Sequence, residues 1–87
     1  MKSVTKTFLS DSGHGWLSVK KQELYDLGIS HKISSYSYEK GKSVYLEEDG
    51  DAGVYLDVQR RMGVRVIIKE GKRHQRSPVR GYNSYTV

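Results

Sequence analysis

The sequence predicts a small α+β domain, and three observations lead to that class. Several segments alternate apolar and polar residues with the period of two that is typical of β-strands. Two other segments carry the features of short helices and end in a glycine followed by an apolar residue, at Gly28-Ile29 and Gly63-Val64. The chain has 87 residues and no cysteine, so its fold cannot depend on a disulfide. A chain of this length is expected to form one domain, residues 1–87, with a thin core.

The first half of the chain is predicted to form four strands and one helix. Residues 4–9 and 16–19 are expected to pair as a hairpin, and Trp16 is expected in the core. A short helix over residues 20–27 follows. Residues 33–38 and 43–47 are then expected to form a second pair of strands, joined by a turn at Lys40-Gly41.

The second half is predicted to hold a helix and two strands. In residues 52–62, Val54, Val58 and Met62 recur at helical spacing and form one apolar stripe. Residues 64–69 are the most strand-like run, and Val66, Ile67 and Ile68 are expected in the core. A polar loop over residues 70–77 and a last extended segment over residues 79–87 complete the chain.

The predicted order of elements is therefore ββαββαββ. Its inner part, βαββαβ, is the pattern of a ferredoxin-like core, which is a small antiparallel sheet with two helices on one face. One further strand would be added at each end of this core.

Charge is divided unevenly along the chain. Residues 1–57 hold seven Lys and nine Asp or Glu, a net of −2, whereas residues 58–87 hold eight Lys or Arg against Glu70 alone, a net of +7. A basic segment of this kind favours an acidic partner, such as nucleic acid, a nucleoprotein complex or a host protein. The alternative is a solvated loop that only keeps the protein in solution. The candidate partner-binding residues are Arg60, Arg61, Lys69, Lys72, Arg73, His74, Arg76, Arg80 and Tyr82.

Three further side chains are candidates for contact with a ligand. Tyr36 and Tyr38 are two residues apart and would share one face of a strand, where their rings could stack on bases. The competing interpretation, which we favour, places both rings in the core or in cross-strand pairs. His14 lies between Gly13 and Gly15 on a pliable backbone, although the same pattern is equally typical of a tight turn.

The acidic run of residues 47–51 is predicted to start the second helix. Four carboxylates in five positions could hold Mg²⁺ or Ca²⁺, but capping by Asp49 or Asp51 is favoured over a metal site. We therefore predict no metal and no cofactor. No nucleophile and base are paired in the sequence, so no catalytic residue is assigned and the protein is predicted not to be an enzyme. No apolar run has the length of a signal peptide core or a membrane span, which predicts a cytoplasmic protein without a membrane partner.

Several segments resemble a group of small uncharacterised proteins from bacteriophages and bacterial mobile elements. The resemblance lies in GHGWL at residues 13–17, LGI at 27–29, KISSYSY at 32–38, VYLEED at 44–49 and SPVRGY at 77–82. It implies an accessory protein of phage or prophage origin that acts in the host cytoplasm, and it brings no catalytic residues. Small phage proteins of this kind often bind and disable a host factor, including bacterial defence systems.

The sequence and the resemblance together predict a non-enzymatic binding protein of phage type. Its basic C-terminal half, residues 58–87, would dock onto nucleic acid or a nucleoprotein complex. The alternative is a phage inhibitor of bacterial immunity that acts by protein contact or by sequestering a nucleotide signal. Self-association as a homodimer is a further option.

Overall fold

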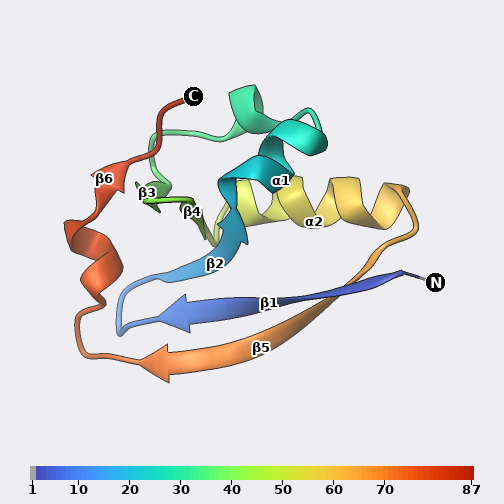
Figure 1. The fold of residues 1–87 in the computed structure, drawn as a ribbon. Helices are drawn as coiled ribbons and strands as arrows, with labels where there is room; N and C mark the ends of the chain where they lie inside the picture. The colour runs from blue at the N-terminus through green and yellow to red at the C-terminus, as the bar shows by residue number, and fades with distance from the viewer. Residues whose placement is uncertain (1) are drawn as a thin grey trace.

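The computed structural model describes residues 2–87 as a mixed six-stranded sheet with two helices (Figure 1). The predicted α+β class is confirmed. Within the described residues, no helix is long and apolar enough to cross a membrane. The elements in chain order are β1 (Ser3–Ser10), β2 (Gly15–Lys20), α1 (Lys21–Asp26), a 3-10 helix (Ser30–Lys32), β3 (Tyr38–Lys40), β4 (Ser43–Glu47), α2 (Asp51–Arg61), β5 (Arg65–Arg73), a second 3-10 helix (Pro78–Gly81) and β6 (Asn83–Ser84).

The strands lie side by side in the order β5-β1-β2-β4-β3-β6. All neighbours are antiparallel except β1 and β5, which run parallel, so the sheet is mixed and not wholly antiparallel. In a ferredoxin-like core, the strand after the second helix would lie directly beside the strand before the first helix. Here β1 lies between these two strands, and the ferredoxin-like core is not confirmed. The short connection between β1 and β2 favours their pairing, because closing a short loop costs little entropy.

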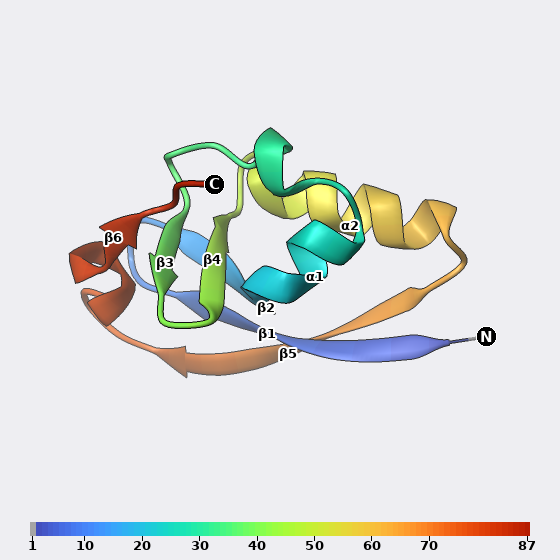
Figure 2. The ribbon, with the colours of Figure 1, turned by 45° about the horizontal axis from the view of Figure 1, so that its top comes forward.

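Both helices cover one face of the sheet (Figures 1 and 2). The core lies between them and the central strands, where Leu17, Val44 and Leu46 are at most 1% exposed. On the helix side, Leu24 of α1 and Tyr55 of α2 are fully buried. The polar end of Tyr55 is satisfied because its hydroxyl donates a hydrogen bond of 2.9 Å to the Glu23 carboxylate of α1. The core therefore joins α1, α2, β2 and β4.

The two predicted helix ends are confirmed. Gly28 has a φ of 70° and Gly63 a φ of 73°, the left-handed conformation that glycine adopts without a steric penalty. Each following residue turns back onto its helix. The Ile29 amide donates to the Leu24 carbonyl and the Val64 amide to the Gln59 carbonyl, both at 2.9 Å.

The start of α2 differs from the prediction that Asp49 or Asp51 caps it. Gly50 is the N-cap residue and has no side chain to offer. The Glu47 carboxylate supplies the missing acceptors, taking hydrogen bonds from the Asp49 amide at 3.1 Å and the Asp51 amide at 3.3 Å. An acidic side chain still serves the helix start, but it comes from the end of β4.

Residues 33–38 do not form the predicted strand, and β3 begins only at Tyr38. The reason is the buried Asp51 carboxylate. It accepts hydrogen bonds from the Ser34 amide at 3.0 Å, the Ser34 hydroxyl at 2.7 Å and the Ser37 hydroxyl at 2.6 Å. These contacts hold the segment in turns that compete with a strand ladder.

The segment around β5 also differs from the prediction. The strand continues through Arg73, into the predicted polar loop. Ile67 and Ile68 are 43% and 48% exposed, so the prediction that they lie in the core is wrong, whereas Trp16 is 2% exposed and that prediction is confirmed. The physical reason is that β5 is an edge strand, away from the two central strands that carry most of the core.

The predicted extended segment 79–87 is mostly not a strand. Pro78–Gly81 form a 3-10 helix and β6 is two residues long. Tyr85 fixes the end of the chain, because it is buried and its hydroxyl donates to the Ser30 carbonyl at 2.9 Å.

Candidate nucleic-acid interface

The two faces of the sheet are distinguished by the side chains of β1. Lys6 points toward the helices, because its Nζ atom lies 2.6 Å from the Glu23 carboxylate of α1. Side chains alternate along a strand, so Thr5 and Thr7 point to the opposite face. We call that opposite side, away from α1 and α2, the open face.

Strand register places basic and hydroxyl side chains side by side on the open face. One row across the sheet consists of Lys69, Thr7, Ser18, Tyr45 and Tyr38. A second row lies two residues further along the same strands. In it Ile67 pairs with Thr5, and Ser43 pairs with both Lys20 and Lys40. None of these residues is acidic, so the two rows form a positively charged surface.

A hollow of about 150 Å³ lies among these rows. We call it the hydroxyl hollow, because Thr5, Thr7, Ser18 and Ser43 all contribute to its lining, together with Lys20. Hydroxyl groups and a lysine can donate hydrogen bonds to phosphate oxygens. The hollow therefore has the chemistry of a phosphate contact.

The C-terminal segment packs against one end of these rows, where Tyr82 meets Tyr45 and Lys40. The Tyr82 ring lies 5.1 Å from the Tyr45 ring, and the Lys40 Nζ atom lies 4.8 Å from the centre of the Tyr82 ring. Burial raises the pKa of the Tyr45 hydroxyl, with the nearby Tyr82 adding to the effect. Tyr82, predicted as a partner-binding residue, is half-buried in this contact.

Asp11 is the residue that the sequence analysis missed. It is 5% exposed, and its carboxylate pairs with Arg80 at 2.6 Å and accepts hydrogen bonds of 2.9 Å each from the amides of Gly13, His14 and Ser77. The hydrogen bond from Arg80, with help from these amides, holds the pKa of the Asp11 carboxyl well below its usual range. The Asp11-Ser12-Gly13 sequence is typical of a turn in which aspartate bonds its own backbone, but nothing local indicates Arg80.

Arg80 therefore has a structural partner within the chain. Its side chain is still 26% exposed, which leaves part of it accessible to a partner. The pair joins the β1–β2 turn to the C-terminal segment, 69 residues apart in sequence.

The other predicted basic residues are spread over separate places. Arg60 and Arg61, at the end of α2, each pair with Asp57 at 2.7 Å and lie in the helix layer. Lys69 lies on the open face. The remaining members follow along the edge of the sheet, with Lys72 and Arg73 at the exposed end of β5, His74 half-buried after it and Arg76 exposed in the next turn.

The three predicted ligand-contact residues are brought together. His14, Tyr36 and Tyr38 line one hollow of about 430 Å³, although Tyr36 lies in a turn and not in a strand with Tyr38. We call it the aromatic hollow. Its other lining residues are Trp16, Glu47, Asp49 and Arg80.

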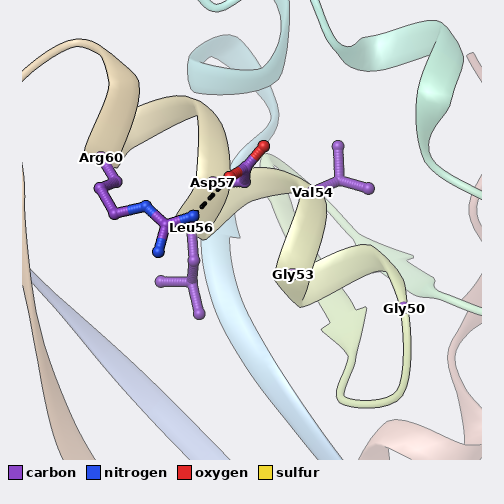
Figure 3. Close-up of a pocket in the computed structure, with 6 residues that line it drawn as sticks. All are labelled: Gly50, Gly53, Val54, Leu56, Asp57 and Arg60. Atoms are coloured by element: carbon purple, nitrogen blue, oxygen red, sulfur yellow. Dashed lines mark hydrogen bonds and ion pairs between the residues drawn. The ribbon is translucent and has the colours of Figure 1, made fainter.

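A third hollow, of about 640 Å³, runs along the outer side of α2 (Figure 3). Its lining comes from this one helix and Gly50 before it, and the Arg60 side chain is paired with Asp57 across it. It does not gather polar groups from different elements, unlike the two hollows of the open face. The residues drawn in Figure 3 are Gly50, Gly53, Val54, Leu56, Asp57 and Arg60.

No family model, curated protein or solved structure matches this chain.

Proposed function

We propose that this protein is a non-enzymatic accessory protein of phage type that binds nucleic acid through the open face of its sheet. The observation that carries this proposal is the hydroxyl hollow, which lies among Lys20, Lys40 and Lys69 in rows that contain no carboxylate. Each lysine can neutralise one phosphate and release its condensed counterions. The hydroxyls can fix the register of the backbone by hydrogen bonds to phosphate oxygens.

The proposed surface draws on both halves of the chain. Lys69 comes from the basic segment 58–87, whereas Lys20 and Lys40 come from the half with the negative net charge. Lys69 on β5 and Lys40 on β3 are four strands apart, roughly 19 Å at the usual strand spacing. At the ~3.4 Å axial rise of one strand in a B-form duplex, that width corresponds to about six nucleotides.

The exposed residues at the end of β5 extend this surface. Lys72 and Arg73 continue the strand that carries Lys69, and Arg76 follows in the next turn. These three residues would contact phosphates beyond the hydroxyl hollow. The basic C-terminal segment is thus one border of the proposed interface.

The test combines charge reversal with a matched control. One variant combines Lys20→Glu, Lys40→Glu and Lys69→Glu. Its affinity for labelled single-stranded DNA should fall by about a hundredfold or more, as measured by fluorescence anisotropy. The control, Lys32→Glu, Arg60→Glu, Arg61→Glu, changes the net charge equally but in the helix layer, and should bind nearly as well as the wild type. Equal losses in both variants would show that only net charge matters and would overturn the assignment of the open face.

A second candidate function is inhibition of bacterial immunity by protein contact. The observation that favours it is the outer edge of β5, which is last in the strand order and carries the exposed Ile67 and Ile68. A partner protein could add a strand there. This candidate predicts that the protein captures a host protein from lysate even after nuclease treatment, and that Ile67→Arg abolishes the capture. The nucleic-acid proposal predicts that nuclease treatment abolishes the capture.

A further inference from the structure

We propose that the aromatic hollow binds a guanine base. The inference rests on the proposed function in one respect: the base would come from a nucleic-acid strand that crosses the open face. The ability of the hollow to bind a base follows from its own residues. Its lining comes from separate parts of the chain, with His14 in the β1–β2 turn, Trp16 in β2, Tyr38 in β3 and Arg80 in the last 3-10 helix. The fold therefore gathers aromatic and charged groups that are far apart in sequence.

The aromatic side chains provide surfaces for stacking a flat ring. Trp16 is buried beneath the hollow, with the His14 ring 6.1 Å away and the Tyr38 ring 6.2 Å away, so the accessible rings are those of His14, Tyr36 and Tyr38. Tyr36 is 79% exposed, yet its backbone is held, because its amide donates to the Ser34 hydroxyl at 3.2 Å. Stacking of bases on such rings is a main source of affinity in single-strand binding proteins.

Aromatic rings and carboxylates often bind cations, and here the protein itself supplies one. The Arg80 guanidinium lies 5.6 Å from the centre of the Trp16 ring. Its pairing with Asp11 fixes it there. The rings of His14, Tyr36 and Tyr38 remain available to a flat ligand.

The polar groups of the hollow match the edge of guanine. Arg80 uses its Nε and Nη2 atoms on Asp11, and among the described residues no acceptor is bonded to its Nη1 atom. Glu47 is already occupied by two backbone amides, whereas the Asp49 carboxylate receives no hydrogen bond from the part of the chain that the structure describes. An arginine donor can meet the O6 atom of guanine, and a carboxylate can accept from its N1–H and N2–H₂ groups.

Adenine presents the opposite pattern on the same edge. Its N6 amino group would face the arginine and its N1 acceptor would face the carboxylate, leaving both protein groups without a partner. The Arg80 side chain is only 26% exposed, and a partly buried donor left without a partner disfavours the wrong ligand. The hollow should therefore prefer guanine to adenine.

The experiment titrates guanosine monophosphate and adenosine monophosphate while following the fluorescence of Trp16, the single tryptophan of the chain. Guanosine monophosphate should bind about tenfold or more tightly than adenosine monophosphate. Asp49→Asn should remove this preference, and Tyr36→Ala should weaken both nucleotides. Equal binding of the two nucleotides to the wild type, or an unchanged preference in Asp49→Asn, would overturn the inference.

Two further arms separate the source of the base and the proposed function. Thymidine strands with one central guanine or one central adenine test whether the hollow accepts the base within a strand. If guanine is preferred only as a free nucleotide and not within a strand, the aromatic hollow binds guanine and its ligand is a free nucleotide. The Lys20→Glu, Lys40→Glu, Lys69→Glu variant should lose strand binding but keep its binding of guanosine monophosphate. Unchanged strand binding in that variant contradicts the proposed function without affecting the hollow.

Discussion

The central strands and the edge strand β5 both carry large aliphatic side chains, but these side chains have opposite environments. Leu17 of β2 and Leu46 of β4 are at most 1% exposed, whereas Ile67 and Ile68 of β5 are 43% and 48% exposed. Both regions have the β-branched or apolar composition that favours strands. An apolar side chain on a strand therefore enters the core only where the position of that strand in the sheet places it against the helices.

The reason lies in how the two helices are placed. Leu24 of α1 and Tyr55 of α2 pack in one cluster with the central strands, and only Val66 of β5 reaches the rim of that cluster. β5 is held mainly by its parallel ladder with β1, so its remaining side chains face solvent. Such side chains are available to a partner at little cost to the fold.

The largest expected effect is at the centre of the sheet. Leu46→Ala should lower the free energy of unfolding by about 2–5 kcal/mol, because it removes fully buried methyl groups and leaves a cavity. Urea unfolding followed by circular dichroism measures this loss. A cost below about 1 kcal/mol would contradict the central position of β4 in the core.

The next effect concerns the anchor that joins the β1–β2 turn to the C-terminal segment. Asp11→Asn should lower Tm by roughly 5–15 °C, because Arg80 loses its charged partner and the buried amides lose an acceptor. Thermal unfolding at neutral pH checks this. A Tm equal to that of the wild type would show that the segment is held without the pair.

The same anchor predicts a pH dependence. The folded-state pKa of Asp11 lies well below its unfolded value, so its contribution is complete above the unfolded pKa of about 3.9 and is lost as the pH falls below it. The Tm of the wild type should therefore fall steeply below about pH 4. Asp11→Asn should show a shallower fall, and parallel curves for the two proteins would contradict this account.

A smaller effect is expected at the two helix ends, one followed by the buried Ile29 and one leading into β5. Gly28→Ala and Gly63→Ala should each cost about 1 kcal/mol, because an added Cβ meets no atom within 4 Å and only the positive φ is penalised. Chemical denaturation measures both. A neutral Gly63→Ala beside a costly Gly28→Ala would indicate that the entry to β5 relaxes easily.

The smallest effect is expected on the edge strand itself. Ile68→Ala should cost less than about 1 kcal/mol, because the side chain is half exposed and leaves no closed cavity. Measured beside Leu46→Ala, it tests the comparison directly. Similar costs for the two variants would mean that β5 is covered in solution, for example by a second copy of the chain.

The sequence by itself determined the local features of this protein. The alternation of apolar residues predicted β1, β2 and β4 closely, because the side-chain period of a strand depends only on neighbouring residues. Gly28 and Gly63 predicted both helix ends, since only the local backbone conformation is involved. The excess of positive charge in residues 58–87 could also be counted directly.

The tertiary structure alone decided which strands are neighbours and which side chains meet. The insertion of β1 between β2 and β5, the pair of Asp11 with Arg80 and the turns that Asp51 imposes on Ser34 and Ser37 all join distant residues. Such contacts depend on a competition among all segments of the chain, which no local pattern records. The open face has the same origin, because strand pairing brings lysines from the acidic and basic halves of the sequence onto one surface.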